Sequence, residues 1–144
     1  MLRFGLLFSF LLLCLPTALQ ATHIVGGEMN YTCLGNDEYE ITLTIFRDCY
    51  NGNPNAWFDN PASIGVFNED NVLLEEILLP LMNNDTLNPV LTSECLVVPP
   101  DVCVHTTTYR TIVTLPPIPG GYQLAYQRCC RNETIVNIVD PLDT

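Results

Sequence analysis

The chain contains no lysine and has little positive charge of any kind. Its 144 residues include five arginines, two histidines and 16 acidic residues, which give a net charge of −11. A chain this acidic is repelled by nucleic acid and by anionic membrane surfaces. The acidic residues are spread along the sequence, which is not the pattern of a disordered acidic tail. The charge therefore argues against nucleic acid as a partner and favours solubility and cation binding.

The sequence also lacks the motifs of the common enzyme classes. It has no glycine-rich phosphate loop and no His-Glu-x-x-His segment. Residues 24–27 (IVGG) have the letters that open a mature trypsin-like protease, but no Gly-Asp-Ser-Gly segment follows, and the chain is too short for two barrels. His105 lies in a Thr-rich alternating stretch, where an exposed or partly buried structural role is expected. We therefore predict that the chain is not an enzyme.

Long apolar runs are absent except at the N-terminus. Arg3 precedes an apolar run from Phe4 to Leu15, and small residues follow up to Ala21. This order is typical of a secretory signal peptide, and the run is shorter than the roughly 20 residues that span a bilayer. We expect residues 1–21 to be removed and the mature chain not to insert into a membrane; an uncleaved anchor is the alternative. Cys14 belongs to the apolar run and is not interpreted as a lipidation site.

Cysteine is plentiful. Removal of the signal peptide leaves six of the seven cysteines and a net charge of −12, because four arginines then face 16 acidic residues. An even number of cysteines behind a secretion signal is typical of a disulfide framework. A zinc site is disfavoured because Cys-x-x-Cys pairs are missing. The expected bridges join the residues Cys33, Cys49, Cys95, Cys103, Cys129 and Cys130.

Geometry suggests one pairing of these cysteines. Cys95 and Cys103 flank a double proline that can turn the chain back, so we expect them to pair locally. Cys49 is in step with the alternating core positions of the strand at 39–46, and Cys130 is in step with those of the strand at 122–129. Both side chains should then point into the core, so they are expected to pair there. Cys33 then pairs with Cys129, although one bulge would exchange Cys129 and Cys130. A strained ring between these two neighbours is a further alternative.

Period-two alternation is the dominant pattern of residues 22–139. It is clearest over residues 39–46, and similar stretches rich in β-branched and aromatic residues recur with Pro, Gly and Asn between them. The expected strands cover residues 27–33, 39–46, 62–67, 72–79, 102–115, 122–129 and 134–139. Residues 73–81 would also fit a short helix. About seven such strands predict an all-β, immunoglobulin-like antiparallel β-sandwich of one domain, followed by the start of a linker at residues 140–144.

One polar loop, residues 47–60, is the richest candidate site. Its carboxylate and amide oxygens could hold Ca²⁺, although Asn, Asp, Gly and Pro also form turns for their own reasons, and the spacing is not that of an EF-hand. The candidate calcium ligands are Asp48, Asn51, Asn53 and Asp59. The aromatic residues Tyr50, Trp57 and Phe58 are candidate ligand contacts; the alternative is a small core beneath the loop.

Four segments are similar to a known family. They are "ATHIVGGEMNYTCLGNDEYEITLTIFRDCYNGNP", "FDNPASIGVFN", "CLVVPPDVCV" and "LPPIPGGYQLAYQRCCRN". They resemble the N-terminal domain of large secreted Bacteroidota proteins that continue into PKD or immunoglobulin-like repeats and a gliding motility-associated C-terminal domain, which the type IX secretion system reads. The resemblance implies a secreted or cell-surface location and an adhesive or structural role. It supplies no catalytic residue. Because no repeat or sorting domain follows, we expect the chain to be truncated, or periplasmic if it is complete at residue 144.

The leading hypothesis is thus a non-catalytic surface module that binds a polysaccharide or a protein. The alternative is a carbohydrate-binding module of a secreted enzyme, with Tyr50, Trp57 and Phe58 as its platform. A small secreted hydrolase is a third hypothesis, for which converging carboxylates would be required.

Overall fold

The computed structural model describes residues 24–87, 97 and 100–128. This part of the chain is all-β and forms two antiparallel sheets. The strands are β1 (Ile24–Gly35), β2 (Glu38–Asp48), β3 (Ala62–Phe67), β4 (Leu73–Leu79), β5 (Asn84–Thr86), β6 (Val104–Thr114) and β7 (Gln123–Tyr126). None of the described residues belongs to a helix that is long and apolar enough to cross a membrane.

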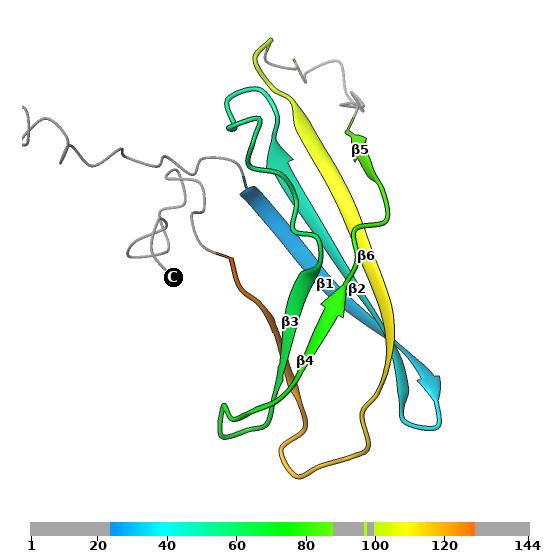
Figure 1. Ribbon diagram of the computed structural model, residues 1–144. Helices are drawn as coiled ribbons and strands as arrows, with labels where there is room; N and C mark the ends of the chain where they lie inside the picture. The colour runs from blue at the N-terminus through cyan, green and yellow to red at the C-terminus, as the bar shows by residue number, and fades with distance from the viewer. Residues whose placement is uncertain (1–23, 88–96, 98–99, 129–144) are drawn as a thin grey trace, which may run out of the picture.

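The strand order is that of an immunoglobulin-like sandwich. One sheet has the order β1-β2-β6-β5 and the other the order β4-β3-β7 (Figure 1). Immunoglobulin domains place strands A, B, E and D in one sheet. Strands C and F lie in the other sheet, together with C′ where it is present. Assigning β1 to β7 as A, B, C, C′, D, E and F reproduces this order. The predicted fold class is therefore confirmed.

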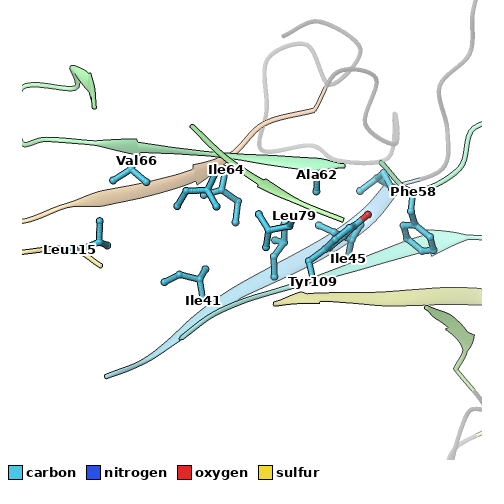
Figure 2. Close-up of a cluster of buried hydrophobic side chains, with 12 residues drawn as sticks. Ile41, Ile45, Phe58, Ala62, Ile64, Val66, Leu79, Tyr109 and Leu115 are labelled. Carbon is cyan, nitrogen blue, oxygen red and sulfur yellow. The ribbon is translucent and has the colours of Figure 1, made fainter. Parts of the chain in front are cut away.

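Alternating side chains build the core between the sheets. On β2, Ile41, Leu43 and Ile45 are buried, whereas the residues between them are half-buried. On β3 every second residue is fully buried, which places Ala62, Ile64 and Val66 opposite the β2 stripe (Figure 2). Period-two patterning thus sorts the side chains to one face because successive residues of a strand point to opposite sides.

Local residues fix the turns between these strands. The β1–β2 hairpin turns at Asn36 and Asp37, whose φ angles of 52° and 62° fit the two positive φ values of a type I′ turn. Between β6 and β7, Tyr122 donates a hydrogen bond from its hydroxyl to the Pro116 carbonyl at 2.6 Å. A tyrosine at this corner that bonds to backbone a few residues upstream is a hallmark of immunoglobulin-like sandwiches.

Several expectations need adjustment. Residues 73–79 form the strand β4, so the helical alternative for residues 73–81 is wrong. β5 was not expected, because Asn84, Asp85 and Thr86 carry no apolar alternation and are ordered by pairing with β6. The predicted signal peptide, the strand at 134–139 and the linker at 140–144 lie outside the described residues and stay predictions.

Candidate functional site: the loop between β2 and β3

Residues 49–61, which we term the β2–β3 loop, cross one end of the sandwich. A disulfide between Cys49 and Cys103 anchors the base of the loop, with a Cα–Cα distance of 5.1 Å. The Cys49 amide also donates a hydrogen bond to the Cys103 carbonyl at 3.0 Å. The last β2–β6 pair is Asp48 with Val104, so the bridge extends the ladder by one further pair. The loop is thus held at the point where it leaves the sheet.

This bridge corrects two predicted pairings. Cys103 does not pair with Cys95, and Cys49 does not pair with Cys130. The parity argument failed for Cys49 because β2 ends at Asp48, and the inward position after Ile45 is taken by Arg47. Cys95, Cys129 and Cys130 lie outside the described residues, so the pairing of Cys33 with Cys129 stays a prediction. Cys33 itself is exposed.

Arg47 organises the loop from beneath. Its side chain is only 2% exposed. Its Nε donates to the Ala56 carbonyl at 2.8 Å and its Nη2 to the Asn53 carbonyl at 2.7 Å, while Nη1 lies 3.2 Å from Nδ1 of His105. Because guanidinium nitrogens only donate, His105 accepts through Nδ1 in this contact. One buried cation therefore satisfies two carbonyls of the loop and ties it to β6.

Trp57 packs over this cation. The Arg47 Cζ lies 4.9 Å from the centroid of the indole ring, within the range of a cation–π interaction. The ring also meets His105 and Phe58 edge-on, at centroid distances of 5.4 and 5.6 Å. Trp57 remains 37% exposed. It is therefore a fixed aromatic side chain with part of its surface open to solvent.

A second anchor holds the far end of the loop. Asp59 accepts a hydrogen bond from the Tyr126 hydroxyl at 2.5 Å and pairs with Arg128 at 3.4 Å. Its backbone carbonyl accepts the Tyr109 hydroxyl at 2.7 Å, and Arg128 Nη2 donates to the Trp57 carbonyl at 2.7 Å. The loop thus makes contacts to both sheets, through Tyr109 on β6 and Tyr126 on β7.

Burial and charge shift the ionisation of these groups. Burial and the Asp59 charge raise the pKa of Tyr109 to about 12, although the Arg128 charge opposes them. Burial and the hydrogen bond to Asp59 also raise the pKa of Tyr126. Burial lowers the pKa of Arg47, which the Asp48 charge partly offsets. Both tyrosines therefore stay neutral donors at physiological pH, and arginine stays charged in any case.

The four candidate calcium ligands take part in different hydrogen-bond networks. The Asp48 carboxylate accepts the amides of Tyr50 and Asn51, at 2.8 and 3.0 Å, and the Asn51 side chain at 3.3 Å. Burial acts to raise the pKa of Asp48, but these hydrogen bonds and the Arg47 charge together lower it. Asn53 Oδ1 accepts the Asn55 amide, and Asp59 belongs to the Arg128 network. Calcium binding stays a prediction, with Asp48 and Asn51 as the pair that lies together.

The three aromatic residues differ in exposure. Tyr50 is 56% exposed and Trp57 is partly exposed, as a contact role requires. Phe58 is 4% exposed and lies in the core near Ile45 and Tyr109, so its assignment as a ligand contact is wrong (Figure 2). Phe58 instead fills a core position beneath the loop, as the alternative interpretation of these aromatic residues expected. Two of the three expected side chains therefore remain available to a ligand.

Sequence reasoning missed the residues that shape the loop. Arg47 follows Ile41, Leu43 and Ile45 at the next inward position, and a cation there is a signal that could have been used. The structure also places Cys49, Cys103 and His105 within 4.8 Å of one another, the only such group of potential metal-binding side chains in the described residues. Because the two sulfurs are bonded to each other, this group does not supply thiolate ligands.

The geometry of this loop is the main guide to function. No protein-family model matches the chain, and no curated protein or solved structure is detectably similar to it.

Proposed function

We propose that the chain is a non-catalytic contact module that binds a surface polysaccharide or protein through the β2–β3 loop. One observation carries the proposal. The loop holds Tyr50 and Trp57 partly open to solvent while a disulfide, a buried arginine and an Asp59–Arg128 pair fix its backbone. Exposed aromatic side chains on a fixed backbone bind with a small loss of conformational entropy.

The position of the loop supports a contact role. Loops at one end of a sandwich carry the binding sites of many immunoglobulin-like domains, because a rigid scaffold positions them. Figure 1 shows the loop at the end of the sandwich where β2 stops and β6 starts, opposite the β1–β2 hairpin. The side chains that most resemble catalytic groups have other roles: His105 contacts Arg47, and the neighbouring cysteines form a disulfide.

The resemblance of four segments to large Bacteroidota surface proteins suggests the setting. In this proposal the domain is the N-terminal module of a secreted or cell-surface protein related to gliding motility-associated proteins. Six cysteines behind an apolar leader fit an oxidising location. The acidic charge fits a soluble partner-binding domain more than a domain that lies on an anionic surface.

A carbohydrate-binding module of a secreted enzyme is the alternative. Tyr50 and Trp57 could stack against sugar rings, but Arg47 occupies part of the indole surface and Phe58 is buried. A flat platform of three rings is therefore absent from the described loop. The partner class is an outcome of the experiment that follows.

The proposal is tested with the labelled protein, without residues 1–21, and intact cells of the organism that produces it. We expect saturable binding whose affinity Tyr50→Ala lowers about tenfold, which corresponds to a loss of about 1.4 kcal/mol. Tyr31→Ala is the matched control: Tyr31 is 70% exposed but pairs with Ile41 toward the opposite end of β2. Periodate treatment of the cells removes binding if the partner is a polysaccharide, and protease treatment removes it if the partner is a protein. Equal binding by wild type and Tyr50→Ala would contradict the proposal.

A further inference from the structure

A hollow of about 260 Å³ opens on the outer face of the β4-β3-β7 sheet. On β3, Ser63, Gly65 and Phe67 alternate with buried residues and therefore face away from the core. Gly65 lies opposite Glu76 of β4 and Ala125 of β7, so small residues form the floor of the hollow. None of the described residues that line it belongs to the β2–β3 loop, so this site is separate from the contact surface proposed above.

Apolar groups line one end of the hollow. The Phe67 ring leans over Gly65, because a Cβ placed at Gly65 would lie 2.5 Å from Cε2 of this ring and 3.3 Å from Cδ1 of Leu73. The missing side chain of Gly65 thus makes room for the ring. Leu73, which lies opposite Phe67 in the β3–β4 pair, is 53% exposed. This end therefore offers an aromatic ring and an aliphatic side chain to a ligand.

Polar groups line the rest of the hollow, and one of them is charged. Glu76 is exposed, and the Ser63 hydroxyl donates to its Oε1 at 2.5 Å. This hydrogen bond orients the carboxylate and leaves Oε2 as a further acceptor. The only ion pair among the described residues joins Arg128 to Asp59, so Glu76 has no ion-pair partner in that part of the chain. Gln127 adds an exposed amide to the rim.

This combination matches the side chain of an arginine. A guanidinium stacks on an aromatic face, and its fork of donors fits a carboxylate. The aliphatic stem of an arginine can pack along an apolar side chain such as Leu73. The net charge of −11 attracts basic segments and disfavours a second copy of this chain as the occupant. A neutral sugar could stack on Phe67, but it would not neutralise the carboxylate of Glu76.

We propose that this hollow binds an arginine side chain that a basic segment of a partner protein presents. The guanidinium lies between the Phe67 ring and the Glu76 carboxylate, and its stem packs on Leu73. The amide oxygen of Gln127 can accept a further N–H of the guanidinium. The sheet face thus provides a second contact, whose test does not depend on the β2–β3 loop.

The amide chemical shifts of Gly65 and Ala125 test the site in the protein without residues 1–21. The probe is a pentapeptide with blocked ends, one central arginine and glycine elsewhere, at millimolar concentration. Matched peptides carry lysine or citrulline, the neutral isostere of arginine, at the centre. We expect saturable shifts with the arginine peptide and about tenfold weaker binding of the citrulline peptide, because charge-assisted hydrogen bonds are about twice as strong as neutral ones. The lysine peptide should also bind more weakly, since an ammonium lacks the planar fork.

Three outcomes of this titration would overturn the proposal. The first is a lysine or citrulline peptide that binds as tightly as the arginine peptide. The second is a response to a neutral oligosaccharide and to none of the peptides, which would assign the hollow to a sugar. The third is the absence of any shift at Gly65 and Ala125.

Matched variants separate the carboxylate of the hollow from the overall charge. Glu76→Gln keeps an acceptor for Ser63 and should weaken binding of the arginine peptide about tenfold. Glu38→Gln removes the same charge from an exposed position on β2 and should change binding by less than about twofold. Unchanged amide shifts on β6 show that each variant is folded. Equal losses in the two variants would mean that the peptide is attracted only by the net charge, and would contradict the site.

Discussion

At the scale of single residues, Arg47 connects the core to the candidate site. It continues the inward stripe of β2, yet it ends in a charged group that bonds the carbonyls of Asn53 and Ala56. A buried cation is tolerated only when it is paired or fully hydrogen-bonded. Here the loop supplies the acceptors, so the fold of the loop and the burial of the cation depend on each other.

Replacing this cation should therefore destabilise the protein. Arg47→Met keeps an apolar stem but leaves two loop carbonyls without their donor, which should lower the free energy of unfolding by about 2–3 kcal/mol. Arg110→Met is the control, because Arg110 is exposed on β6 and should change stability by less than about 0.5 kcal/mol. Urea denaturation measures both. Equal effects in the two variants would contradict the role given to Arg47.

The buried tyrosines predict loss of stability at high pH. The pKa of Tyr109 is about 12 in the folded protein and about 10 when unfolded. Because the pKa is raised in the folded state, Tyr109 contributes its full stabilisation of the folded protein below about pH 10. This contribution is lost as the pH rises from about 10 to 12. Urea midpoints across this range should fall more steeply for wild type than for Tyr109→Phe. Parallel pH profiles would contradict the assignment.

Residue roles were the least predictable part of the sequence. The core residues Ile41, Leu43 and Ile45 follow from alternation alone. Phe58 was misassigned because it lies in a polar loop next to Trp57, and only the path of the loop decides which of the two rings enters the core. The interactions of Asp59 join β7 to the loop across a long separation in sequence, which no local pattern encodes.

At the scale of elements, the β1–β2 hairpin can be improved. Asp37 has a φ of 62°, where glycine is better suited, and a type I′ turn favours Asn-Gly. We expect Asp37→Gly to raise the free energy of unfolding by about 0.5 kcal/mol. Asp70→Gly is the control, because Asp70 is a turn residue without a positive φ and should gain nothing. A lower melting temperature for Asp37→Gly would show that this turn is not of type I′.

The Cys49–Cys103 bridge is the element that defines the loop. It joins residues 54 positions apart, and the chain-entropy model gives about 4 kcal/mol for a loop of this length. Replacing both cysteines with alanine should lower the melting temperature by more than about 10 °C, because each kcal/mol lost from the free energy of unfolding lowers it by about 4 °C. Peptide mapping without reduction should recover Cys49 linked to Cys103. A peptide that links Cys103 to Cys95 would contradict this pairing.

The elements show what alternation can and cannot predict. It located β2, β3, β4 and β6 closely, because each has a buried face. It missed β5, whose residues are polar and exposed. It also misplaced the disulfide, because the proximity of Cys49 and Cys103 follows from β2 and β6 being hydrogen-bonded neighbours. Strand order in space is a tertiary property that a single sequence does not state.

At the scale of the whole molecule, the core of the sandwich supports the loop for which a contact role is proposed. The core between the sheets fixes the ends of β2, β3, β6 and β7, and the β2–β3 loop spans those ends with contacts to both sheets. Such a scaffold tolerates sequence change in the exposed part of the loop with little effect on the fold. In the proposed function, this loop end, and not a sheet face or the hairpin end, meets the partner.

Hydrogen-exchange footprinting tests that claim most directly. The protein without residues 1–21 is compared free and bound to polysaccharide and protein extracts from the surface of the producing cells. The account predicts slower exchange on binding in residues 49–60 and at the start of β6, with no change at the β1–β2 hairpin. Protection confined to the hairpin end or to the outer face of β3 and β4, with the loop unchanged, would contradict it.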